Sequence, residues 1–237
     1  MKQQSITPTF GAIVEGIDMA RLAPPVMRRL YDLWQQRHVL VLRGQRPDRA
    51  AFEAFAAGFG DVEPMPHLRG GETCWDAEMS CADRPPFACA LRCVEAPEHG
   101  GASWFSCLPA ALRSMAPDLA ARLHWLALQH GPNVHPMVIM QPETGEKTLY
   151  LGARRTSRIR GLPDAESERL LNIVWSYATA ASVTLCHRWQ AGDVLLWNNL
   201  TVAYRHDLTP AGTSRVLQGM RIKGRYTLSA PIQQEAA

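Results

Sequence analysis

The chain has 237 residues, 46% of them hydrophobic, so it is long enough to bury a substantial core and has the composition of a globular protein. The 25 Lys and Arg residues against 22 Asp and Glu residues give a net charge of +3, which is too balanced to indicate binding to nucleic acid or to a membrane surface. We therefore expect one domain, residues 1–237, whose partner is a small molecule.

The sequence carries no pattern of a signal peptide and no apolar run of the length needed to span a bilayer, so we expect a cytoplasmic protein. Its cysteines lack the spacing of a zinc ribbon, and in the cytoplasm we expect them to be reduced. We interpret five of them as small apolar residues and single out Cys74. The six cysteines are Cys74, Cys81, Cys89, Cys93, Cys107 and Cys186. The composition is also compatible with a homo-oligomer.

The first quarter of the chain predicts short strands followed by helices. Residues 5–22 have the pattern of short strand segments with Gly turns. A helix is predicted from Pro24 to about Arg37, because Pro is favoured in the first turn of a helix. The β-rich run 38–45 follows, and Asp48 then caps a second predicted helix that ends near residue 60.

The middle of the chain predicts one long strand, helices and a hairpin. The strand covers residues 87–94, and helical segments are expected at 109–115 and 117–129. A strand, a Thr-Gly turn and a second strand follow over residues 135–151. A further helix, with an apolar face, is predicted to begin near Asp164.

The stretch from Arg188 to Gly224 has the pattern of a pocket wall. A turn leads into the apolar run 194–197, a polar turn and a strand follow, and a return strand begins at Arg215. An alternating strand, a turn and a return strand with one Arg are how a β-barrel places a cation against a bound carboxylate.

Several motifs together resemble one known family. They are the run 39–45 ending in Arg-Gly-Gln, Phe59-Gly60-Asp61, Gly100-Gly101-Ala102-Ser103, the segment 135–151 and Trp197-Asn198-Asn199-Leu200. The chain, from about Ile6 to Gly224, resembles the TauD/TfdA (taurine dioxygenase-like) family of iron(II)- and 2-oxoglutarate-dependent oxygenases. The resemblance implies an α+β fold with a double-stranded β-helix (jelly-roll, cupin-like) core and flanking helices.

The resemblance also implies the positions of a site. The family binds iron(II) with a His-x-Asp motif and a distant His, and Cys74, Asp76 and Tyr204 occupy these columns here. Ser103 and Arg215 occupy the columns of the Thr and Arg that bind the far carboxylate of 2-oxoglutarate. By resemblance the cofactors are therefore 2-oxoglutarate and Fe(II), and the substrate is a small carboxylate-bearing metabolite.

The changed residues alter the charge of the metal site. A thiol and a phenol bind metals well only after deprotonation, so Cys74, Asp76 and Tyr204 would together carry three negative charges. Such a set favours iron(III), whereas the family chemistry needs two neutral imidazoles and one carboxylate on iron(II). We therefore do not expect ordinary Fe(II)/2-oxoglutarate turnover.

Three functional hypotheses follow. In the first, the metal site is rebuilt: His206 lies two residues beyond Tyr204, on the same face of a strand, and a β-bulge could move it into the ligand position beside Asp76. His67 or His99 would then replace the first His.

In the second hypothesis, the inherited pocket supports a metal-independent enzyme in which Asp76 and Tyr204 transfer protons. Nucleophilic catalysis by Cys74 has less support, because a neighbouring carboxylate disfavours its thiolate.

In the third hypothesis, the protein is a non-catalytic binding or assembly subunit, a pseudoenzyme whose pocket is filled by Trp75, Met79 and Trp197. A sulfonate substrate is not expected, because Gly219 occupies the column of the Arg that binds the sulfonate in taurine dioxygenase.

Overall fold

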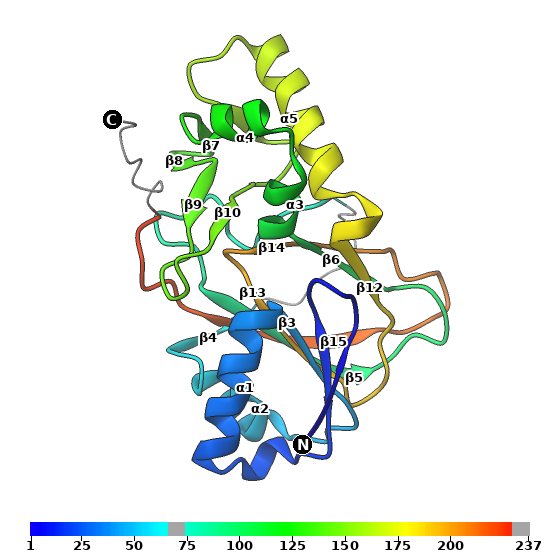
Figure 1. Ribbon diagram of the computed structural model, residues 1–237. Coiled ribbons are helices and arrows are strands. Elements are labelled where there is room, and N and C mark those ends of the chain that lie inside the picture. The colour runs from blue at the N-terminus through cyan, green and yellow to red at the C-terminus, as the bar shows by residue number, and fades with distance from the viewer. Residues whose placement is uncertain (66–73, 229–237) are drawn as a thin grey trace.

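The computed structural model describes residues 1–65 and 74–228 (Figure 1). Its main sheet has seven strands in the order β1-β2-β3-β13-β5-β15-β4, and only the β2–β3 pair is parallel. Three neighbouring strands of this sheet, β13, β5 and β15, are therefore distant in sequence and adjacent in space. The strands are β1 (Lys2–Ser5), β2 (Ala12–Glu15), β3 (Val39–Leu42), β4 (Val62–Met65), β5 (Ala88–Glu95), β13 (Val194–Asn198) and β15 (Val216–Ile222).

A second sheet packs against one face of the main sheet. Its order is β12 (Thr184–His187), β6 (Ser103–Cys107), β14 (Val202–His206), and all pairs are antiparallel. Phe105 of β6 contacts Trp197 of β13 with ring centroids 5.7 Å apart, and Leu91, Leu195 and Val202 belong to the same buried cluster. The two sheets thus enclose an apolar core, which is the arrangement expected for a jelly roll.

Two helices cover the opposite face of the main sheet. They are α1 (Pro24–Arg37) and α2 (Arg49–Ala57), and a short 3-10 helix, η1 (Met19–Arg21), precedes α1. Leu40 and Leu42 of β3 pack with Trp34 of α1 and Phe52 of α2 in a second buried cluster. Because β3 is covered on both faces, its sequence is continuously apolar and does not alternate.

The remaining elements gather beyond the second sheet (Figure 1). Two small sheets, β11-β7-β8 and β10-β9, lie with the other helices, and α3 packs against both β10 and α5. No helix in the described part of the chain is long and apolar enough to cross a membrane. The elements are α3 (Leu108–Ser114), α4 (Pro117–Leu123), β7 (Ala127–His130), β8 (Asn133–Pro136), β9 (Val138–Met140), β10 (Lys147–Leu149), β11 (Ser157–Ile159), α5 (Asp164–Ala178) and η2 (Ala181–Val183).

The helix expected over residues 117–129 is correct only in its first half. Helix α4 ends at Leu123, and the following residues form β7, the central strand between β8 and β11. Leu128 is only 2% exposed in that position. The main-chain pairing of β7 with two partners outweighs the helical spacing of the leucines, which is a local preference.

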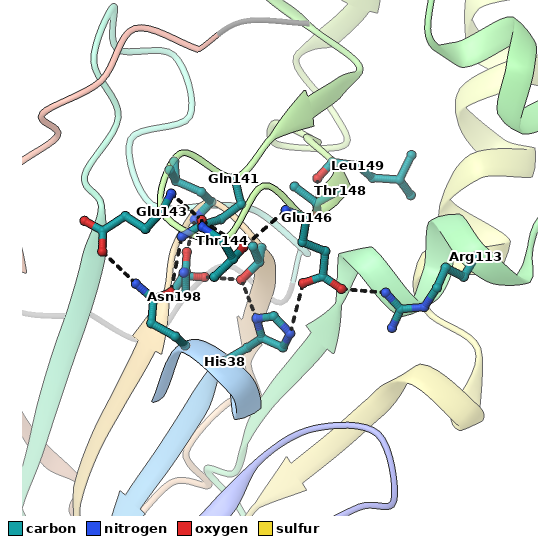
Figure 2. A network of polar contacts seen from close by, with 12 residues as sticks. His38, Arg113, Gln141, Glu143, Thr144, Glu146, Thr148, Leu149 and Asn198 are labelled. Carbon is teal, nitrogen blue, oxygen red and sulfur yellow. Dashed lines mark hydrogen bonds and ion pairs between the residues drawn. The ribbon is translucent and has the colours of Figure 1, made fainter. Parts of the chain in front are cut away.

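A polar network closes the C-terminal end of α1 (Figure 2). His38 has a left-handed backbone, with φ of 60°, and its amide donates to the carbonyl of Trp34. Its ring contacts Thr201 Oγ1 through Nδ1 at 3.1 Å and Glu146 through Nε2 at 3.6 Å, and Arg113 donates to Glu146 at 2.6 Å. These contacts connect α1 to the β9–β10 hairpin and to α3.

Candidate functional site

Strand β14 brings the two candidate residues of the C-terminal hairpin to one face. It pairs with β6 in unbroken register from Val202 to His206, so that Tyr204 lies opposite Phe105 and His206 opposite Ser103. Because this pairing has no bulge, His206 remains two residues beyond Tyr204 and does not move into the ligand position that Tyr204 occupies.

The other edge of β14 meets the segment that contains Asp76. The amide of Asp76 donates to the carbonyl of Tyr204 at 3.0 Å, and the amide of Tyr204 donates back at 2.8 Å. The fold therefore places the Asp76 and Tyr204 columns side by side. Cys74, a half-buried free thiol, lies two residues before Asp76.

The Tyr204 hydroxyl donates to a mostly buried ion pair, which Glu78 forms with Arg221. It donates to Oε2 of Glu78 at 2.6 Å, and Arg221 donates to Oε1 of the same carboxylate through Nε at 2.8 Å and Nη2 at 2.5 Å. The Glu78 and Arg221 side chains are 11% and 15% exposed. Burial and the charge of Glu78 raise the pKa of Tyr204 well above its ordinary value, so the phenol stays protonated at neutral pH.

The Asp76 carboxylate is held by a different set of donors. Its Oδ1 accepts from the amide of Ala77 at 2.7 Å and from the hydroxyl of Ser80 at 2.9 Å. Ser80 Oγ lies 2.8 Å from Nδ1 of His130, whose Nε2 lies 2.9 Å from Oγ1 of Thr156. A chain of side-chain hydrogen bonds thus runs from Asp76 to the exposed Thr156.

Ser103 is engaged by protein groups. Its oxygen accepts from Nε1 of Trp189 at 2.9 Å and lies 2.7 Å from Nδ1 of His206. Burial, and secondarily the positive charge of Arg215, lower the pKa of His206 to about 3, so its ring is neutral at neutral pH. The Nε2 atom of His206 is buried and has no hydrogen-bond partner within the described part of the chain.

Arg215 is a half-buried cation close to this group. Its Nη1 donates to the carbonyls of Gly101, at 2.6 Å, and Asp207, at 3.3 Å. Among the described residues, no carboxylate lies within ion-pair distance of its guanidinium. A cation that contacts only neutral carbonyls at a partly buried position is suited to hold an anion.

The donors do not fit iron(II). Within residues 1–65 and 74–228, no three His, Cys, Asp or Glu side chains are grouped so that they could hold a metal. The residue in the second His column, Tyr204, is a protonated phenol bound to Glu78. His99 is exposed on a loop, and His67 lies outside the described residues.

Gly219 leaves no room for a side chain that would bind a sulfonate. A Cβ atom at this position would lie 2.8 Å from Cβ and 2.9 Å from Sδ of Met65, and 3.0 Å from Cδ2 of Leu91. These distances are shorter than side-chain packing allows, so the neighbouring strands fill the space that an Arg would need.

The sequence analysis missed several residues at the site, among them Glu78, Arg221 and Trp189. Arg221 is a charged residue within the otherwise apolar end of β15, and a charge that is buried in a strand needs a partner. That signal was available in the sequence. The identity of the partner was not, because Glu78 and Arg221 are 143 residues apart.

Comparison with known proteins gives a family match over nearly the whole chain. Residues 2–221 match the family described as taurine catabolism dioxygenase TauD, TfdA family. The chain is 26% identical to a (S)-phenoxypropionate/alpha-ketoglutarate-dioxygenase of Sphingobium herbicidovorans, over 91% of this chain and 92% of that protein. It is also 26% identical to an alpha-ketoglutarate-dependent 2,4-dichlorophenoxyacetate dioxygenase of Cupriavidus pinatubonensis, over 84% and 89% of the two chains.

The solved structures agree with the predicted fold. A taurine dioxygenase from Burkholderia xenovorans superposes with a TM-score of 0.88 and 25% identity, covering 97% of this chain and 91% of that one. The expectation of an α+β protein with a jelly-roll core and flanking helices is confirmed.

Proposed function

We propose that the barrel of this chain, which belongs to the taurine catabolism dioxygenase TauD, TfdA family, binds a small carboxylate-bearing molecule without iron and does not catalyse iron(II)-dependent oxygenation. The proposed binding groups are Arg215 and the adjoining end of β14, and the protein is then a pseudoenzyme of its family.

The observation that carries this proposal is the hydrogen bond from Tyr204 to Glu78. The position of a neutral imidazole ligand is occupied by a phenol with a raised pKa, and its hydroxyl donates to a carboxylate that Arg221 already neutralises. Ionising this phenol for a metal would place a second negative charge beside Glu78 in a buried site, which is costly.

Arg215 supports the carboxylate part of the proposal. It is a half-buried cation that contacts backbone carbonyls, and an anion would supply the charge that these carbonyls lack. The two relatives described above are named for phenoxypropionate and 2,4-dichlorophenoxyacetate, both carboxylates, and for alpha-ketoglutarate. 2-Oxoglutarate is therefore the first ligand to test.

The test is anaerobic calorimetric titration of 2-oxoglutarate into the purified protein, with a chelator and separately with iron(II). We expect the same affinity in both, and we expect Arg215→Ala to weaken binding by about 2 to 4 kcal/mol, the loss of a charge-assisted pair. Arg188→Ala, which removes an exposed Arg near the same hairpin, is the matched control. Binding that needs stoichiometric iron would overturn the proposal.

A second experiment addresses the metal directly. The double variant Cys74→His/Tyr204→His should acquire iron(II) that the wild-type protein does not retain, since it supplies two neutral imidazoles beside Asp76. Elemental analysis after dialysis against iron(II) measures the difference. Equal iron in the wild type and the double variant would contradict it.

The metal-independent enzyme remains a separate prediction. It requires turnover that survives a chelator and is lost in Asp76→Ala and in Tyr204→Phe. The binding protein that we propose shows no such turnover.

A further inference from the structure

We propose that the Nε2–H group of His206, and not the hydroxyl of Ser103, is the hydrogen-bond donor that works with Arg215 to bind the carboxylate. This inference rests on the proposed function, and it assigns Ser103 and Trp189 as positioning residues for the imidazole. The ligand group is then one carboxylate that contacts Arg215 with one oxygen and His206 with the other.

The first step is the proton count at Ser103. A hydroxyl has one hydrogen to donate. The oxygen already accepts from Nε1 of Trp189, and the acceptor in contact with the hydroxyl is Nδ1 of His206, at 2.7 Å. Because Ser103 is fully buried, its hydrogen points to Nδ1 and is not available to a ligand.

The second step is the tautomer of His206. If Nδ1 accepts from Ser103, the hydrogen of the neutral ring is on Nε2. The Nε2 atom is buried and has no partner in the described part of the chain. A buried N–H group without an acceptor is destabilising, and a ligand oxygen that accepts from it would remove that cost.

The third step is the position of Arg215. Its Nη1 contacts the carbonyl of Gly101, two residues before Ser103, and its charge acts on the His206 ring. The charge of Asp207 acts on both groups, but its carboxylate accepts from Trp104, pairs with Arg205 and lies outside ion-pair distance of Arg215. Within the described residues, a donor without an acceptor and a cation without an ion-pair partner therefore lie at the same end of β6 and β14. One carboxylate would satisfy both.

The fourth step is why His206 is a donor and not an obstruction. If the ring only filled the space of the ligand, its buried Nε2–H would stay without an acceptor, and removing the ring would not weaken binding. If the ring is a donor, its Nε2–H donates to a negative oxygen that also contacts the guanidinium of Arg215, and removing the ring weakens binding. The sign of the effect of removing the ring distinguishes these two roles.

The first measurement is the tautomer, read by long-range ¹⁵N–¹H correlation NMR of the histidine rings in the full-length protein. We expect protonated Nε2 and unprotonated Nδ1 for His206, and a mixture of tautomers in Ser103→Ala, because that variant loses the donor to Nδ1. Protonation at Nδ1 in the wild type would overturn the inference whatever ligand binds.

The second measurement is titration calorimetry with 2-oxoglutarate, succinate and acetate. We expect His206→Ala to weaken the binding of whichever of these binds by at least tenfold and His206→Gln, which keeps an N–H donor, to recover part of the loss. Arg188→Ala should bind like the wild type.

The outcomes separate the two proposals. If Arg215→Ala loses binding while His206→Ala binds equally well or more tightly, His206 is an obstruction, the inference fails and the carboxylate site stands. If the wild type binds none of the three probes at about 10 mM, which exceeds the dissociation constant of a weak, millimolar site, both proposals fail.

Discussion

At the scale of single residues, the ion pair of Glu78 with Arg221 is the feature that most distinguishes this site. Replacing Glu78 by Gln leaves a mostly buried guanidinium whose next carboxylate, Glu63, is 3.7 Å away. We expect the free energy of unfolding to fall by about 3 kcal/mol, the lower end for breaking a buried pair, because Glu63 compensates in part. Urea denaturation measures this loss.

The matched control is Glu63→Gln. The Glu63 side chain is 41% exposed, so we expect its loss to cost about 0 to 1 kcal/mol. Equal losses in the two variants would show that the guanidinium is stabilised by solvent and not by Glu78.

The same substitution should change the ionisation of Tyr204. The charge of Glu78 is the second cause, after burial, of the raised pKa of this phenol. We therefore expect Glu78→Gln to move one tyrosine to ionise at lower pH, which ultraviolet difference spectroscopy during alkaline titration detects. Tyr204→Phe removes the signal and identifies it. A titration curve that is unchanged by Glu78→Gln would mean that the hydroxyl does not bind this carboxylate in solution.

At the scale of elements, the start of α2 shows how local sequence determines a helix. Asp48 has an extended backbone and its Oδ1 accepts from the amide of Ala51 at 2.7 Å. We expect Asp48→Ala to lower the free energy of unfolding by about 1 kcal/mol, because an amide of the first turn loses its acceptor. In Asp48→Asn, which keeps an oxygen acceptor, we expect less than half of that loss in the same denaturation experiment.

The elements differ in how well they could be predicted. Helices α1 and α2 follow from Pro24, from Asp48 and from apolar residues at helical spacing, all of which act within one or two turns. Strand β7 could not be predicted in this way, because its leucines are spaced as in a helix and its partners β8 and β11 decide its conformation.

At the scale of the whole molecule, four histidines make stability depend on pH. Burial lowers the pKa values of His38, His130, His135 and His206, the last to about 3. Below about pH 6.5 these rings are charged in the unfolded chain, whereas in the folded protein they take up a proton only at lower pH, so the unfolded state binds more protons. The stability that they contribute is complete above pH 6.5 and is lost as the pH falls.

We therefore expect the free energy of unfolding to decrease between pH 7.5 and pH 5, with about 2 kcal/mol of the decrease due to His206. Urea denaturation at several pH values measures it. The variant His206→Gln should show a smaller slope than the wild type. A stability that rises on acidification over this range would contradict the buried, neutral state of these rings.

The sequence by itself determined the family resemblance, the order of most elements and the columns of Cys74, Asp76, Ser103, Tyr204 and Arg215. These depend on short motifs and on the alternation of apolar residues, which act along the chain over a few residues.

Only the tertiary structure decided what those side chains contact. That Tyr204 donates to Glu78, and that Ser103 is engaged by His206 and Trp189, depends on tertiary contacts between residues 86 to 126 positions apart. The residue type at each position of the family motif determines which hydrogen-bond donors the site contains. The register of β14 against β6 and the partners that it brings within hydrogen-bonding distance determine which of those donors are free to bind a ligand.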